Sequence, residues 1–134
     1  MDGSILRDES LKDVLAAGVA APSPDNNQPW RFRWRQDTLT IFLDRGQALP
    51  SDVCHMFDLM SAAAVIENIT LAASKHGLNT TIEPIWNPDD SSKFPKVAQV
   101  HFSPGASPDP LAESIPARCT NRLPYSRKPL LDDH

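Results

Sequence analysis

The sequence predicts an α+β fold in which a mixed or antiparallel sheet of about four strands packs on one long central helix. Three observations predict it. Residues 53–76 are apolar and helical in pattern, residues 30–44 alternate as a pair of strands, and residues 79–86 and 96–102 have the composition of two further strands. The chain has 134 residues, of which 40% are hydrophobic and 22% charged, so it suits one globular domain covering residues 1–134.

The first element is a helix over residues 8–21, DESLKDVLAAGVAA. Asp8 or Ser10 is the expected N-terminal cap, because their side-chain oxygens can accept hydrogen bonds from free backbone N–H groups. Pro22 is expected to end the helix. The apolar residues recur at helical spacing: Leu11, Val14, Leu15 and Val19.

The second and third elements form a β-hairpin over residues 30–44, WRFRWRQDTLTIFLD. Strict alternation places aromatic side chains on one face of the first strand and arginines on the other. Residues 36–38 are expected to turn, and residues 39–44 return as the second strand. The loop that follows ends in a capping residue, Ser51 or Asp52. The aromatic face comprises Trp30, Phe32 and Trp34, and the basic face comprises Arg31, Arg33 and Arg35.

The long helix is expected from Val53 to about His76, and Gly77 ends it. At about 1.5 Å per residue it would be about 36 Å long. Its middle, residues 59–73, is apolar or small almost all the way round, so it needs cover on more than one side. A single sheet covers only one side. We therefore expect the other side to pair with a second copy of the chain, or with the second half of a duplicated chain.

The remaining elements are two strands and a tail. Residues 79–86, NTTIEPIW, and 96–102, KVAQVHF, contain β-branched and aromatic residues and should complete the sheet. The tail from Ser103 onward holds six prolines and should follow the surface with little regular structure. Between Ile115 and Leu131 the tail carries no acid and four basic residues: Arg118, Arg122, Arg127 and Lys128.

The composition argues against several partners and sites. The net charge of −4 and the pI of about 5.4 argue against nucleic acid. No apolar run reaches the roughly 18 residues of a membrane span and no signal-peptide pattern opens the chain, so we expect a cytoplasmic protein without a membrane segment. Cys54 and Cys119 are too few for a disulfide framework, and no His/Cys spacing predicts a metal site.

The connection between the first helix and the hairpin, SPDNNQPW at residues 23–30, is open to two interpretations. In the first it is only a turn, since Pro ends helices and Asn and Asp side chains bond their own backbone in turns. The glutamine and the doubled asparagine remain unexplained by that reading. In the second, these amides form a binding site, because they offer both donors and acceptors to the edge of a heterocycle or to a partner's backbone.

Three stretches resemble the nitroreductase family, FMN-dependent enzymes of α+β fold. APSPDNNQPWRF resembles the family signature A-P-S-x-x-N-x-Q-P-W-x-F, and SAAAVIENITLAASKHGL is similar to its long central helix, around which two subunits pair. RCTNRLPYSRKPL resembles the family's C-terminal basic segment. The likeness covers roughly residues 8–131. It is closest to the Acg-type branch, in which two reductase-like halves share one chain, and to modules fused to ThiF-like adenylating domains.

The resemblance implies an FMN site in the loop. It places Ser23 and Asn26 against the flavin, often across the interface between subunits, with Pro24 between them. Gln28 and Trp30 would fix the loop and the core. The resemblance also implies phosphate contacts from the basic tail, since guanidinium groups suit phosphate oxygens. The tail candidates are Arg122 and Arg127, and the alternative for this segment is a solvated basic surface.

The implied function is that of an FMN-binding oxidoreductase using NAD(P)H, in which the flavin carries the hydride and no side chain is named as catalytic. Two departures support an alternative. The chain has no R-x-S-x-R segment before its first helix, and Pro84 lacks an N–H where reductases place one near flavin N5. The alternative is a non-catalytic module, either for flavin storage or as a structural half-domain fused to a ThiF-like partner. A truncated chain, or one half of a duplicated chain, is a further alternative for residues 1–134.

Overall fold

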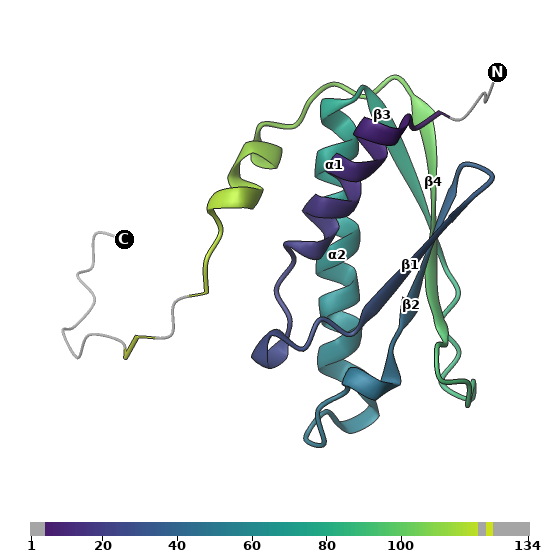
Figure 1. The fold of residues 1–134 in the computed structure, drawn as a ribbon, viewed down its shortest axis with the longest axis vertical. Coiled ribbons are helices and arrows are strands. Elements are labelled where there is room, and N and C mark those ends of the chain that lie inside the picture. The colour runs from purple at the N-terminus through teal and green to yellow at the C-terminus, as the bar shows by residue number, and fades with distance from the viewer. Residues whose placement is uncertain (1–4, 121–122, 125–134) are drawn as a thin grey trace, which may run out of the picture.

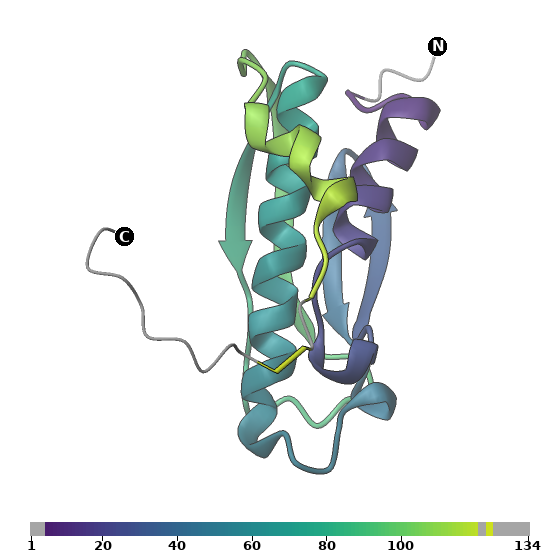
Figure 2. The same cartoon turned by 90° about the vertical axis from the view of Figure 1, so that its left-hand side faces the viewer.

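The computed structural model describes residues 5–120 and 123–124. Two helices lie side by side on one face of a four-stranded sheet, which is the expected α+β arrangement (Figure 1). A 3₁₀ helix, η4, covers part of the helical layer from outside (Figure 2). The main elements are α1 (Asp8–Val19), β1 (Trp30–Arg35), β2 (Thr38–Leu43), α2 (Met56–Lys75), β3 (Leu78–Pro84), β4 (Lys96–Pro104) and η4 (Pro110–Ala117).

The sheet is antiparallel throughout, in the order β1-β2-β4-β3. The β1–β2 hairpin turns at Gln36 and Asp37, whose φ angles are 50° and 55°. Two consecutive residues with positive φ are typical of the tight turn that matches the twist of paired strands. The predicted hairpin and its alternation are confirmed: Trp30 is buried, and Arg31, Arg33 and Arg35 are exposed.

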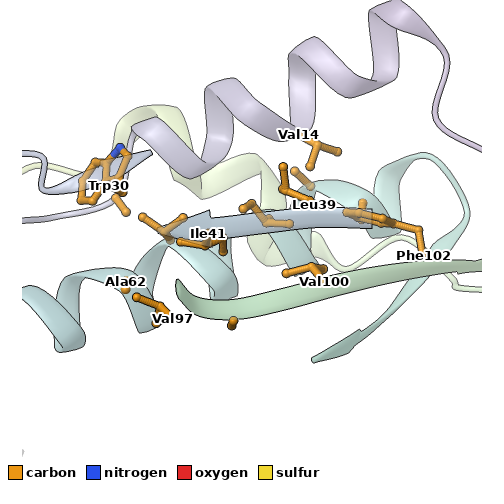
Figure 3. Packing of buried hydrophobic residues seen from close by; sticks show 14 of the residues in the cluster. Val14, Trp30, Leu39, Ile41, Ala62, Val97, Val100 and Phe102 are labelled. Atoms are coloured by element: carbon orange, nitrogen blue, oxygen red, sulfur yellow. The ribbon is translucent and has the colours of Figure 1, made fainter. Parts of the chain in front are cut away.

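The core lies between the sheet and the two helices (Figure 3). Alternate residues of β2 and β4 point inward and meet the facing sides of α1 and α2. Trp30 joins this core from the start of β1 and is 7% exposed. Each large apolar side chain removed from water contributes about 1.5–3 kcal/mol. The fully or nearly fully buried members include Val14, Leu39, Ile41, Leu43, Val65, Ile69 and Val100.

The beginning of α1 differs from the expectation. Neither Asp8 nor Ser10 is the N-cap; that position is Arg7, and both predicted residues lie inside the first turn. The Ser10 hydroxyl accepts a hydrogen bond from the Arg7 N–H and donates one to the Arg7 carbonyl, each at 3.0 Å. Ser10, three residues after the N-cap, therefore satisfies the backbone groups of the N-cap residue with its hydroxyl. The helix ends at Val19, two residues before the predicted end at residue 21.

Helix α2 begins at Met56 rather than at Val53, because residues Val53–His55 form a 3₁₀ turn. Cys54 and His55 have left-handed φ angles of 58° and 56°, which stop the helix from extending backward. Asp52 is confirmed as a cap: its carboxylate oxygens accept N–H bonds from Phe57 at 2.8 Å and Asp58 at 2.9 Å. The helix ends at Lys75, before Gly77 with its φ of 72°.

The side of α2 that faces away from the sheet is covered over only half of its length. The C-terminal half meets η4 through an ion pair at 2.9 Å between Lys75 Nζ and Glu113 Oε1, and through the Asp109 N–H, which donates to Ser74 Oγ at 2.9 Å. The expectation of little regular structure in the tail is thus wrong for residues 110–117. Around the start of α2, four apolar side chains remain exposed: Val53, Met56, Phe57 and Met60.

Residues Val53–Lys75 are long and apolar enough, by length and composition alone, to cross a membrane. The expectation that no apolar run is long enough for a membrane span is therefore not confirmed for this helix. The core helix of a soluble protein can pass the same test. In this structure α2 packs against α1, the sheet and η4, and 39% of its apolar stretch is buried.

Candidate functional site

The loop between α1 and β1, residues 22–28, is called the amide loop below. Three of its residues have left-handed φ angles: Asp25 at 48°, Asn26 at 56° and Gln28 at 47°. Asn and Asp are several-fold enriched in this conformation, whereas a glutamine is not. Such residues persist where the surroundings determine them, and they cluster at functional sites. The amide loop is therefore a conformation held by its own contacts.

Gln28 makes two of the contacts that stabilise this loop conformation. Its backbone N–H donates to Ser23 Oγ at 3.0 Å, and its side-chain Nε2 donates to Asn26 Oδ1 at 3.3 Å. Trp30, two residues on, is buried in the core. These contacts confirm the expectation that Gln28 fixes the loop and Trp30 the core.

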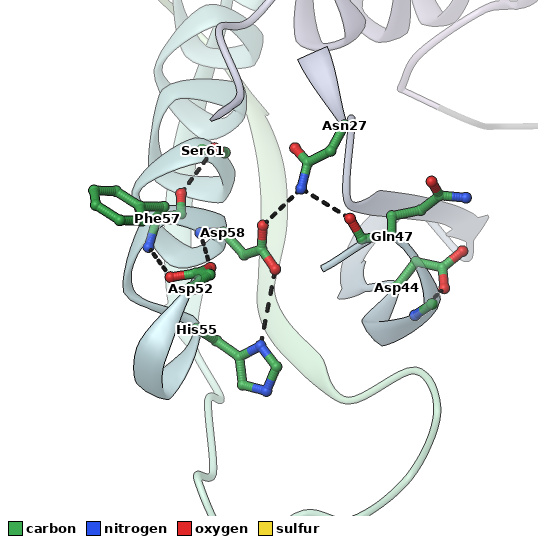
Figure 4. A network of polar contacts seen from close by, with 9 residues as sticks. Asn27, Asp44, Gln47, Asp52, His55, Phe57, Asp58 and Ser61 are labelled. Carbon is green, nitrogen blue, oxygen red and sulfur yellow. Dashed lines mark hydrogen bonds and ion pairs between the residues drawn. The ribbon is translucent and has the colours of Figure 1, made fainter. Parts of the chain in front are cut away.

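Asn27 ties the loop to the rest of the molecule (Figure 4). Its Nδ2 donates to the carbonyl of Gln47 and to Asp58 Oδ1, both at 3.0 Å. Asp58 lies in the first turns of α2, 31 residues further along the chain. Neither Asn27 nor Asp58 was among the predicted site residues. A carboxylate in the first turn of an otherwise apolar stretch of helix, residues 56–66, was the signal that could have drawn attention to Asp58.

Asp58 is a fully buried carboxyl group. Burial raises its pKa above the ordinary value, and the negative charge of Asp52 acts in the same direction. The Asn27 hydrogen bond lowers the pKa, as does the neighbouring His55. Desolvation is the largest of these effects, so the net direction is upward. His55 Nδ1 lies 3.8 Å from Asp58 Oδ2.

Two hollows border the amide loop. The first, of about 350 Å³, is lined by the start of the loop and by the exposed side of α2. The second, of about 560 Å³, is lined by the loop amides and the start of β1. The first hollow contains Pro22, Ser23, Pro24, Phe57, Met60, Ser61 and Ala64. The second contains Val19, Asn26, Asn27, Gln28, Trp30, Arg31, Phe32 and Gln47.

The predicted flavin residues are thus divided between these hollows. Ser23 and Pro24 face the apolar side chains of α2, and Asn26 lies in the second hollow. Arg122 and Arg127 lie outside the described residues. Within the described part of the basic segment, Arg118 Nη2 donates to the carbonyl of Ala20 at 3.2 Å, which brings the tail back to the end of α1, beside the loop.

Pro84 is the last residue of β3 and pairs in register with Ala98 of β4. Because β3 is an edge strand, a residue without an N–H is tolerated there. The backbone hydrogen bond resumes one residue later, where the Ile85 N–H donates to the Val97 carbonyl at 2.9 Å.

Comparison with known proteins gives relatives that agree with this fold. The chain is 28% identical over 134 residues to "Putative NAD(P)H nitroreductase acg" of Mycobacterium tuberculosis, covering 96% of this chain and 40% of that protein. The chain thus spans about two fifths of the length of this curated relative. The name agrees with the likeness to the Acg-type branch, whereas a ThiF-like partner remains a prediction. No family model matches the chain.

Solved structures share the fold at low sequence identity. A "putative nitroreductase" from Desulfovibrio desulfuricans, solved in complex with FMN, gives a TM-score of 0.61 at 23% identity, covering 92% of this chain and 90% of the other. An FMN-dependent nitroreductase from Clostridium difficile gives 0.61 at 19% identity, covering 81% and 80%. The sequence relatives with nitroreductase names and the solved nitroreductase structures thus agree with one fold for this chain.

Proposed function

We propose that this chain binds FMN as a nitroreductase-like oxidoreductase that uses NAD(P)H in the cytoplasm. One observation carries the proposal: the first hollow brings Ser23 and Pro24 of the amide loop against the exposed side chains of Phe57 and Met60. The first hollow has a volume of about 350 Å³, within the range of ligand sites, and it combines apolar walls with a hydroxyl group.

The side chains present fit a flavin. The apolar walls of the first hollow suit the ring system, and the amides that line the second hollow suit the polar edge of a heterocycle, so the proposed site takes in both hollows beside the loop. Asn26 Oδ1 accepts from Gln28, while the Asn26 Nδ2 group has no hydrogen bond within the described part of the chain and is exposed to a ligand. When bound, FMN supplies the hydride chemistry. The residues of this chain bind and orient the ring and exclude water from it.

We propose that the exposed start of α2 pairs with a second copy of the chain or with the second half of a longer one. Phe57 and Met60 line the first hollow and are also exposed, so a partner placed there would complete its walls. Exposed apolar patches rimmed by polar residues mark interaction sites. Such a pairing would make the flavin site a shared one.

Absorbance of the purified chain tests the function. We expect a protein that retains or takes up FMN, shows the visible flavin bands, and loses them when NADPH is added without oxygen. Flavin bands that persist with NADPH would favour the storage alternative, to which Pro84 gives some support because it lacks an N–H. A chain that takes up no FMN contradicts the proposal.

A further inference from the structure

A cluster of polar groups near the start of α2 lies outside the proposed flavin site and is called the DHD cluster below. It consists of Asp52, His55 and Asp58, spaced three residues apart in the sequence. Each residue offers one potential metal-ligating atom, and these atoms all lie within 4.8 Å of one another. Asp58 is fully buried, Asp52 is 8% exposed, and His55 is partly exposed at the surface of the cluster (Figure 4).

Two atoms of the DHD cluster have unused bonding capacity. Asp58 Oδ2 and His55 Nδ1 are both buried and have no hydrogen-bond partner among the described residues. Buried polar atoms normally form hydrogen bonds, so two neighbouring buried atoms without one require an explanation. The 3.8 Å between them is too long for a hydrogen bond and lies within the separation of two ligands on one metal ion.

The charges of the DHD cluster also favour a bound cation. Two carboxylates lie side by side with little exposure, and their one ion-pair partner among the described residues is His55, 3.8 Å from Asp58 and a cation only when protonated. Paired buried carboxylates without a permanent cation are costly. Asp52 uses its oxygens to accept the N–H groups of Phe57 and Asp58, but a carboxylate has about four lone-pair positions and retains some for a metal.

We propose that Asp52, His55 and Asp58 form a binding site for a divalent transition-metal cation of the Zn²⁺ type, with its remaining positions open to water. The donor set decides the class of metal. An imidazole nitrogen with carboxylate oxygens suits Zn²⁺ and its neighbours, whereas Mg²⁺ prefers oxygen ligands and keeps its water shell. Zn²⁺ holds such ligands at about 2.0–2.2 Å, so binding would draw the ligand atoms, which lie within 4.8 Å of one another, closer together.

The position of the DHD cluster gives the cation a structural consequence. Asp58 holds Asn27 of the amide loop through its other oxygen, Oδ1. His55 also packs edge-on against Trp86, with the ring centroids 6.2 Å apart. A bound cation would therefore fix the 3₁₀ turn at residues 53–55, the start of α2 and the carboxylate that anchors the loop. This inference does not depend on flavin binding.

Metal titration of the full chain, after dialysis against EDTA and then into metal-free buffer, tests the site. We expect Zn²⁺ to bind one per chain in calorimetry and to raise the melting temperature, since a ligand of the native state stabilises it. Co²⁺ should bind at the same site and show visible ligand-field absorption. Mg²⁺ should leave the Co²⁺ spectrum unchanged. Displacement of Co²⁺ by Mg²⁺ would contradict the claim that the His55 nitrogen is a ligand.

Variants locate the binding. His55→Gln and Asp58→Asn should each weaken Zn²⁺ affinity by at least about tenfold. His76→Gln is the matched control, because His76 also pairs with an aspartate, Asp13, at 3.3 Å but has no third ligand among the described residues. The Zn²⁺ affinity of this variant should equal that of the wild type. His55→Gln keeps the test decisive if Asp58→Asn fails to fold. Absence of saturable Zn²⁺ binding, or wild-type affinity in His55→Gln, overturns the proposal.

Discussion

The two adjacent asparagines of the amide loop have different environments. Asn27 is half-buried and bridges the loop to Asp58 and Gln47, while Asn26 is exposed and bonds only within the loop. The turn interpretation therefore holds for Asn27, which is structural. The binding interpretation stays a prediction for Asn26, whose side chain is exposed.

Asn27→Ala should lower the free energy of unfolding by about 1–3 kcal/mol, because it leaves Asp58 Oδ1 and the Gln47 carbonyl without their donor. Urea unfolding monitored by circular dichroism measures it. Asn26→Ala is the matched control and should change the stability of the flavin-free protein by no more than a few tenths of a kcal/mol. Equal losses in the two variants would contradict the division of roles.

Trp30→Ala should destabilise the fold by about 3–5 kcal/mol, since Trp30 is 7% exposed and belongs to the core. Phe94→Ala serves for comparison, because Phe94 is 42% exposed and its loss should cost less than about 1 kcal/mol. Thermal unfolding of both variants without flavin gives the ranking. A Trp30→Ala protein as stable as Phe94→Ala would show that Trp30 is not a core anchor.

At the scale of the elements, helices α1 and α2 are in close contact at Gly18. A Cβ atom added there would lie 3.1 Å from Ile69 Cγ1, tighter than ordinary contact. The absence of a side chain at this point of α1 therefore allows the two helices to pack. Glycine costs helix stability in itself, and here the packing offsets that cost.

Gly18→Leu should destabilise the protein by about 1–3 kcal/mol, because the larger side chain overpacks the contact with Ile69. Ala16→Leu is the control on the same helix, since Ala16 is exposed, and it should change stability by less than about 0.5 kcal/mol. Denaturant midpoints of the two variants give the comparison. Wild-type stability in Gly18→Leu would mean that the helices are further apart than described.

Some of the helices and strands could be predicted from the sequence and others could not. Alternation in residues 30–44 predicts the hairpin, because a shift by one residue would turn every aromatic side chain to the wrong face. The late start of α2 could not be predicted, since Cys54 has no preference for left-handed φ and the modest enrichment of His there does not mark a helix boundary by itself. The helix η4 depends on Ser74 and Lys75 of α2, which lie far from it in the sequence.

Part of the candidate site could be predicted from the sequence and part could not. Ser23, Pro24 and Asn26 belong to a local motif, so the sequence could propose them. The bond between Asn27 and Asp58 joins residues 31 positions apart and appears only when the loop meets α2. The DHD cluster depends likewise on the 3₁₀ turn before α2, which brings His55 back toward Asp58.

At the scale of the whole molecule, the outer side of α2 is covered at one end by the tail and exposed at the other. The exposed end holds Met56, Phe57 and Met60, at 55%, 44% and 63% exposure. Of these, Phe57 and Met60 adjoin the amide loop through the first hollow. Pairing and flavin binding are therefore expected at the same surface.

Sedimentation equilibrium should show a dimer of the purified chain at micromolar concentration. Met60→Asp should shift it toward monomer, because a charge placed in an apolar interface is costly. Leu111→Asp is the matched control: Leu111 is 61% exposed on η4 and lies outside this surface, so the variant should dimerise as the wild type does. A folded, soluble wild-type monomer at this concentration would contradict the pairing proposal.

The most direct test of the central claim is the FMN affinity of Asn26→Ala against that of the wild type, measured by titration with flavin fluorescence. The amide loop as a flavin site predicts that the variant loses about 1–3 kcal/mol of binding free energy, a rise of about 5–150-fold in Kd, with an unchanged melting temperature of the flavin-free protein. Gln99→Ala, which removes an amide outside the loop, should keep wild-type affinity. Equal FMN affinity of wild type and Asn26→Ala would contradict the account.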